Sequence, residues 1–119
     1  MKTSDLKDLA LDWAAAKCAG WLDHKTIISI NGANISWYDP RFDDGCQYST
    51  LPSYSTDWAQ GGPIIERERL CLYDIGGDEW GCDDNLTPRS TGPTPLIAAM
   101  RCYVASKLGD EIEIPEELQ

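Results

Sequence analysis

The stretch STDWAQGGPIIERE, residues 55–68, gathers residue types that a small-molecule pocket needs. An indole offers a large apolar face, and a glycine lets another group approach the backbone closely. Pro63 opposes a continuing helix, so we expect the two glycines before it to reverse the chain. The stretch then forms either a base-stacking pocket or a tight corner anchored by a buried indole. Its predicted ligand-binding residues are Trp58, Gln60, Gly61 and Gly62.

The loop TPRSTGPTP, residues 87–95, is a candidate anion site because it leads into a predicted helix. Unpaired N–H groups and the helix dipole make a helix N-terminus attractive to phosphate or carboxylate. No acidic residue follows Thr94 in the first turn, so the positive end of the dipole is uncompensated. The alternative is an ordinary capped helix after a Ser/Thr loop. The predicted anion-binding residues are Arg89, Ser90, Thr91, Thr94 and Arg101.

Other reactive side chains are scattered. His24 is the only histidine, and its neighbours Asp23 and Lys25 place it in an expected exposed loop. The five cysteines include no C-x-x-C pair, and no basic residue stands beside Cys46 or Cys82. Neither cysteines nor acids have the spacing of a zinc or calcium site. We therefore predict no catalytic residue, metal or cofactor. A small hydrolase that pairs His24 with Cys46 or Cys82 is an alternative.

The length and the net charge of the chain further limit its possible functions. The chain has 119 residues, and we expect one domain over 1–119. Its 20 acids against 10 bases give a net charge of −10, which repels nucleic acid and anionic membranes. The first residues mix acids with apolar residues, unlike a signal peptide, and no apolar run could span a bilayer. We expect a cytoplasmic protein with reduced thiols that binds neither nucleic acid nor membrane.

The acids are concentrated at residues 74–84 and 110–117. Such blocks are commonly a solvated face and a solvated tail. A second interpretation is that they imitate the phosphate backbone of a nucleic acid. The protein would then act as an acidic interaction inhibitor of a nucleic-acid-binding host factor.

Two helices are predicted from apolar spacing and from end signals. The first covers about residues 5–19, capped by the side chain at position 4 or 5 and ended by Gly20 in the left-handed conformation. The second covers 95–108, with Thr94 as N-cap, a proline in the first helical position and Gly109 at its end.

Strands are predicted where β-branched and aromatic residues lie between turn signals. The predicted strands and turns are 26–30, Asn31-Gly32, 33–38, an extended segment from Ile64, and a hairpin at Gly76-Gly77. Residues 39–54 are predicted to be an irregular loop, and the tail 110–119 to follow a sheet edge or remain loose. The predicted fold is α+β, with two helices packed on one face of a small antiparallel sheet made of hairpins. We expect the Trp58 corner to meet the start of the last helix.

Two blocks of sequence resemble a known family. They are STDWAQGGPIIERE and GPTPLIAAMRCYVASKLGDEIEIPEEL, supported by ALDWAAAK in the first helix. In these blocks the chain is similar to the small NinX-like accessory proteins of lambdoid phages and their prophages. The resemblance implies an accessory protein made in the cytoplasm of an infected bacterium. It supplies no catalytic residues.

Together these observations favour a phage-encoded, non-enzymatic binding protein, and we expect a homo-oligomer. Its ligand would be a small anion or a host protein. One concrete form is the sequestration of a nucleotide-like signal of host defence. The acidic interaction inhibitor and the small hydrolase are the alternatives.

Overall fold

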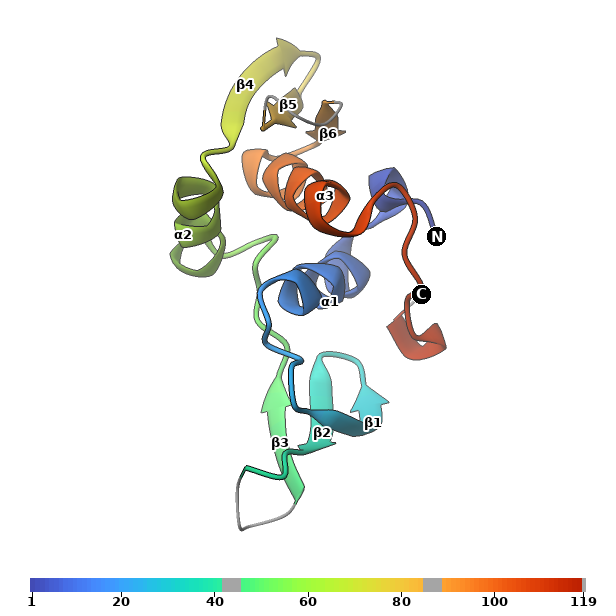
Figure 1. The fold of residues 1–119 in the computed structure, drawn as a ribbon. Helices are drawn as coiled ribbons and strands as arrows, with labels where there is room; N and C mark the ends of the chain where they lie inside the picture. Colours follow the sequence, from blue (N-terminus) through green and yellow to red (C-terminus); the bar gives the residue numbers. More distant parts are fainter. Residues whose placement is uncertain (42–45, 85–88, 119) are drawn as a thin grey trace.

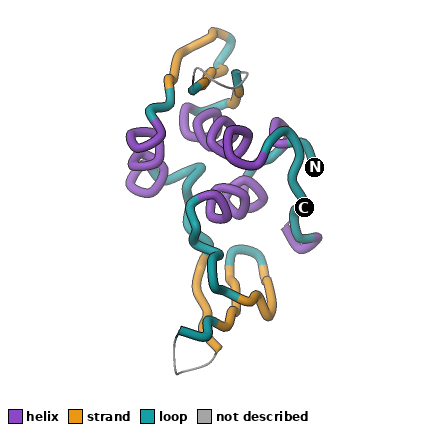
Figure 2. The backbone as a smooth tube through the Cα atoms, in the orientation of Figure 1, coloured by secondary structure: helices purple, strands orange, loops and turns teal. Residues whose placement is uncertain are grey.

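The structure, a computed structural model, describes residues 1–41, 46–84 and 89–118. Within those residues it contains three α-helices and two three-stranded antiparallel sheets. The predicted α+β class is confirmed, but the strands form two sheets instead of one. The helices occupy the middle of an elongated molecule with one sheet at each end (Figure 1). Its principal extents are 49 × 27 × 23 Å. Figure 2 shows the same separation of strands from helices.

The first helix, α1 (Asp8–Cys18), begins later than predicted. Thr3–Asp5 instead forms a separate 3-10 turn, η1, and the extended residue Leu6 after it is fully buried. The helix can start only after that side chain has entered the core, so the predicted cap at position 4 or 5 is wrong. Lys7 is the N-cap and makes no side-chain cap hydrogen bond. Gly20 adopts the predicted left-handed conformation, with φ 82°.

The last helix, α3 (Pro95–Leu108), has the predicted bounds. The Thr94 hydroxyl oxygen accepts a hydrogen bond from the Ile97 N–H at 3.1 Å, which confirms the predicted cap. Helices α3 and α1 pack against each other and form the centre of the core. Tyr103 and Val104 of α3 are buried there.

A further helix, α2 (Trp58–Glu68), replaces the predicted chain reversal. The prediction was wrong because Pro63 lies inside this helix and removes only one intrahelical hydrogen bond. The carbonyl that loses it belongs to Ala59, which is exposed to water. The N-cap is Asp57, whose carboxylate accepts a hydrogen bond from the Ala59 N–H at 2.9 Å. Arg69 ends the helix in the left-handed conformation, with φ 54°.

The first sheet has the order β1-β2-β3. Its strands are β1 (Thr26–Asn31), β2 (Asn34–Tyr38) and β3 (Cys46–Thr50). The predicted first hairpin is confirmed, although its turn is Gly32-Ala33, one residue later than predicted. Strand β3 falls in the predicted irregular loop, because pairing with β2 and not local propensity makes it extended. Ile35 and the partly buried Trp37 pack toward the core.

The second sheet has the order β4-β5-β6. Its strands are β4 (Cys71–Gly76), β5 (Glu79–Asp83) and β6 (Ser90–Gly92). The predicted second hairpin is confirmed, but its turn is Gly77-Asp78 and not the predicted Gly76-Gly77. The φ angles of the two turn residues are 63° and 61°. Positive φ at both central positions is the geometry that such two-residue turns require. Strand β6 falls where a loop was predicted, and it packs β5 against α3.

The described residues of the acidic tail lie along the N-terminus, not along either sheet. The Thr3 N–H donates to the Asp110 carbonyl at 2.7 Å, and the Ile112 N–H donates to the Met1 carbonyl at 3.0 Å. Ile112 and Ile114 are buried, as is Leu118 in the final 3-10 turn η2 (Glu116–Leu118). The alternation of isoleucine with acid therefore reflects one buried and one solvated side of the tail.

Candidate functional site

The Trp58 segment and the start of α3 meet in space. A hollow of about 210 Å³ lies between them. It is lined by Ser55, Thr56, Trp58, Thr94, Pro95, Leu96 and Ile97. The Trp58 side chain is 55% exposed, so the indole is not the buried anchor of a corner. Gly61 brings α2 against α3, because a Cβ added there would lie 2.7 Å from the Leu96 Cδ2 atom.

This hollow offers few hydrogen-bond donors. In the first turn of α3, Pro95 has no N–H, and the Ile97 N–H is taken by the Thr94 side chain. The Ala98 N–H donates to the Thr94 carbonyl at 3.0 Å. The hollow is therefore bounded mainly by apolar groups and the indole face, a surface better suited to an apolar side chain or a flat ring than to a phosphate.

Of the predicted anion-binding residues, only Thr94 lines the hollow beside Trp58. Arg89, Ser90 and Thr91 line a different and larger cleft, of about 460 Å³. Its other lining residues are Lys2, Thr3, Ser4, Ala105, Asp110 and Glu111. These lining residues come from β6 and η1, the residues that precede each of them, the second half of α3 and the start of the tail.

Both cations of this cleft are available. Lys2 and Arg89 are exposed, and among the described residues neither forms an ion pair. The Arg89 stem lies over Gly81, because a Cβ added to that glycine would lie 3.1 Å from the Arg89 Cδ atom. Asp110 and Glu111 are also exposed, and Glu111 pairs with Lys2 in an isolated antiparallel bridge. The cleft thus presents cations, acids and hydroxyl groups, with the Lys2 and Glu111 side chains next to each other.

Two other predicted ligand-binding residues have internal partners. Arg101 donates from Nε to the Leu6 carbonyl and from Nη1 to the Thr91 carbonyl, both at 2.8 Å, so it joins η1 to β6. Burial lowers the pKa of this guanidinium. Gln60 accepts a hydrogen bond from the Ser53 N–H at 3.0 Å and donates to the Asp57 carboxylate at 3.0 Å. Gly62 lies beside the Trp58 ring.

The sequence interpretation missed the contribution of the two chain ends to the larger cleft. Lys2 and Ser4 come from the N-terminus, and Asp110 and Glu111 from the tail. The available signal was the Ile112 and Ile114 alternation, which indicates that one side of the tail packs. Nothing in the sequence indicates that the packing partner is the N-terminus.

The residues of the hydrolase alternative lie apart. His24 is exposed in the turn before β1, whereas Cys82 is fully buried in β5 of the other sheet. Burial and the adjacent Cys102 thiol raise the pKa of Cys82, which opposes a thiolate nucleophile. The side chain of Cys46 lies outside the described part of the structure. Among the described residues, no three His, Cys, Asp or Glu side chains converge as a metal site would require.

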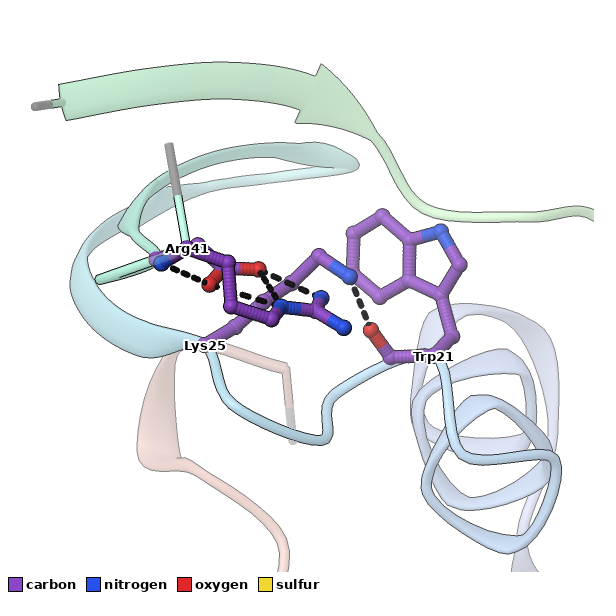
Figure 3. Close-up of polar contacts among 4 residues, drawn as sticks. Trp21, Lys25 and Arg41 are labelled. Carbon is purple, nitrogen blue, oxygen red and sulfur yellow. Dashed lines mark hydrogen bonds and ion pairs between the residues drawn. The ribbon is translucent and has the colours of Figure 1, made fainter. Parts of the chain in front are cut away.

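Two groups of polar contacts lie beside the first sheet, one after β2 and one in the link between α1 and β1. The Asp39 carboxylate is fully buried and receives hydrogen bonds from the Arg41 Nε and Nη2 atoms and the Arg41 N–H. Nearby, the Lys25 ammonium donates to the Trp21 carbonyl, with its Nζ atom 4.6 Å from the Trp21 ring centroid and 5.0 Å from that of Trp37. Figure 3 shows the hydrogen bonds made by Arg41 and by Lys25. The Lys25 contacts stabilise the link between α1 and β1. None of these residues lines either hollow.

The contact between Asp39 and Arg41 predicts a specific acid sensitivity. Hydrogen bonds from Arg41 lower the pKa of Asp39 to about 2, whereas an unfolded aspartate has a pKa of about 4. The ionised carboxylate therefore contributes stability above pH 4, and that contribution is lost as the pH falls from about 4 toward 2. Replacing Asp39 by Asn should lower stability at neutral pH and flatten its decline in this window. Urea denaturation of both proteins from pH 2 to 7 measures the free energy of unfolding at each pH. If that free energy falls equally steeply with pH below pH 4 in both proteins, the prediction is contradicted.

The fold and its hollows define a small α+β protein with open surface clefts. Among the described residues, no helix has the length and apolar character needed to cross a membrane. The family model described as "Bacteriophage P22, NinX" matches residues 2–107, so the chain belongs to the bacteriophage P22 NinX family. The match covers α1, α2, both sheets and nearly all of α3. No curated protein matches the chain.

Proposed function

We propose that this NinX-family protein is a non-enzymatic binding protein that holds a small anionic, nucleotide-like ligand in the cleft lined by Arg89. The observation that carries the proposal is the coincidence of size and chemistry. The cleft measures about 460 Å³ and brings Arg89, Ser90 and Thr91 together with Lys2. Ligand sites commonly have volumes of about 300–1,000 Å³. The Trp58 hollow, at about 210 Å³, is smaller than that.

The charges support an anion in spite of the acidic protein. An arginine that is not already paired can donate two parallel hydrogen bonds to a phosphate or carboxylate. Ser90, Thr91 and Ser4 can add hydroxyl donors, and Lys2 a second positive charge. Asp110 and Glu111, which also line the cleft, would accept from amino or hydroxyl groups of the same ligand. A ligand with a phosphate at one end and ribose hydroxyls or an exocyclic amine at the other matches this arrangement.

In an infected cell such a protein would sequester its ligand. The family belongs to bacteriophages, and a nucleotide signal of host defence is a ligand whose removal would benefit a phage. Binding without turnover is sufficient for this role. We therefore place the protein among phage accessory proteins that act by capture and not by catalysis.

Calorimetric titration with inorganic phosphate and a panel of mononucleotides and cyclic dinucleotides tests the proposal. We expect Arg89→Ala to weaken binding by about tenfold to one hundredfold, the value of a charged hydrogen bond. Lys17→Ala is the matched control, because it removes one exposed positive charge from the end of α1, away from both hollows. Loss of binding in Trp58→Ala but not in Arg89→Ala would indicate that the ligand binds in the smaller hollow. Affinity unchanged in both variants would exclude both sites.

The acidic interaction inhibitor is the second candidate, and the exposed acids at the tip of the β4–β5 hairpin favour it. Asp74, Asp78 and Glu79 are all exposed there, with no basic residue between them. They would face a basic host surface, and the complex would weaken steeply with salt. Nucleotide binding at Arg89 would not be expected in that case.

A further inference from the structure

Edge strands present unpaired backbone N–H and C=O groups to any strand that approaches, and proteins usually blunt them. In the described residues the two sheets have β1, β3, β4 and β6 at their edges. Strand β1 is interrupted between Ile27 and Ser29, and β4 between Asp74 and Gly76, by register shifts. Strand β6 has only three residues. Each of these three edges therefore carries a feature that opposes pairing with another chain.

Strand β3 carries no such feature. It pairs with β2 residue for residue, without a register shift, from Cys46 to Thr50. It contains no proline and no charged residue, and its main contacts among the described residues are with β2. The Tyr48 side chain is 87% exposed. Figure 1 shows β3 at the edge of the sheet, at the end of the molecule away from β4–β6. Strand β3 is thus an open template for a further strand.

The face of this sheet turned away from the core is also uncharged. The register with β2 places Asn34, Ser36, Tyr38, Tyr48 and Thr50 on that face. The residues of β1 paired with them are Thr26, Ser29 and Asn31. The chain as a whole carries 20 acids and 10 bases, so an uncharged surface of this extent is unusual for it. A basic partner would gain nothing from such a surface, whereas two copies with a net charge of −10 each repel least where neither presents a charge.

We propose that a second copy of this chain pairs antiparallel along β3 and forms one continuous six-stranded sheet across a two-fold axis. Antiparallel pairing of identical strands is self-complementary, as a two-fold interface requires. It brings the two Tyr48 side chains onto the same face, where aromatic residues on neighbouring strands attract each other. Five residues of strand extend over only about 17 Å. The interface is therefore smaller than the roughly 1,200–2,000 Å² of a stable complex, and the dimer is reversible.

Sedimentation equilibrium of the full chain over a wide concentration range tests this. We expect a monomer–dimer equilibrium that tightens as salt rises from low to physiological concentration, because salt screens the repulsion between two acidic copies. Tyr48→Lys places like charges on paired strands and should weaken the dimer by about tenfold or more. Ile28→Lys is the matched control, since Ile28 is 54% exposed on the bulged strand β1 at the other edge.

Each possible result of the sedimentation experiment either supports or overturns the proposed dimer. Circular dichroism first establishes that both variants are folded, as expected for exposed positions. A monomer at every concentration would overturn the proposal. So would a dimer that Tyr48→Lys leaves intact, or one that both variants weaken equally. Nucleotide binding at Arg89 involves the opposite end of the molecule, so failure of either proposal leaves the other standing.

Discussion

Replacing Gly61 by alanine should destabilise the protein by about 2–3 kcal/mol. The same change at Gly62 should alter stability by less than about 1 kcal/mol, because the gain in helix propensity is opposed by Pro63, which disfavours a helical backbone in the residue before it. A Cβ at position 61 would lie 2.4 Å from the Tyr54 carbonyl oxygen and 2.7 Å from the Leu96 Cδ2 atom. At Gly62 the nearest atom outside the adjoining residues is the Trp58 Cε3 atom, at 3.9 Å. Of the two positions, only a methyl group at 61 would therefore clash with another segment of the chain.

The Tyr54 carbonyl cannot retreat easily, because its neighbours are held on both sides. The Ser53 N–H donates to Gln60, and the Ser55 N–H donates to the buried Asp12 carboxylate at 2.9 Å. The clash would therefore move α2 away from α3. Urea denaturation followed by tryptophan fluorescence measures both variants, and Gly62→Ala controls for the general effect of adding a methyl group to this helix. Changes of the same sign and similar size would contradict the proposed close packing.

Replacing Arg101 by methionine should cost about 2–4 kcal/mol even when no ligand is present. The substitution keeps much of the apolar stem but removes the donors to the Leu6 and Thr91 carbonyls. Leu6 is fully buried, so its carbonyl would be left without a partner away from water, which is the costly case. Arginine also supplies two donors in a fixed fork, which a lysine cannot reproduce. Arg101→Lys should therefore recover only part of the loss.

Lys107→Met on the same helix is the control for Arg101. Lys107 is exposed, and its ion pair with Glu68 at 2.8 Å lies at the surface, so its loss should be much smaller. Thermal denaturation followed by circular dichroism compares the three variants. Equal destabilisation by Arg101→Met and Lys107→Met would mean that Arg101 does not join η1 to β6. It would then be available for a ligand, as the sequence interpretation predicted.

The elements predicted correctly are those that local chemistry determines. Helix α3 has a capping threonine, a proline at its start and Gly109 at its end, and all three act as predicted. Both hairpins form because glycines near residues 32 and 77 allow positive φ. Helix α2 was missed because Gly61, Gly62 and Pro63 have poor intrinsic helix propensity. Helix α2 packs against α3, and this packing overrides the low propensity. The packing requires a glycine at position 61, because a Cβ there would clash with Leu96.

The candidate site, like the fold, could be predicted from the sequence only in part. Proximity of the Trp58 segment to the start of α3 could be predicted from residue types, and the two do meet. The division of the predicted residues between two hollows could not, because it depends on where β6 pairs and on where the tail packs. Strand β6 exists only through its pairing with β5. The same pairing places Ser90 and Thr91 beside the N-terminus, in a different hollow from the Trp58 indole.

Mapping of a nucleotide titration by ¹⁵N-resolved NMR tests the central claim most directly, because it locates the ligand without any substitution. The proposed function predicts saturable shifts of the backbone amides of Ser90, Thr91 and residues 2–4, with smaller shifts at 110–111. Shifts confined to residues 55–58 and 94–97 would place the ligand in the smaller hollow. The absence of saturable shifts across the nucleotide panel would contradict a nucleotide-binding function.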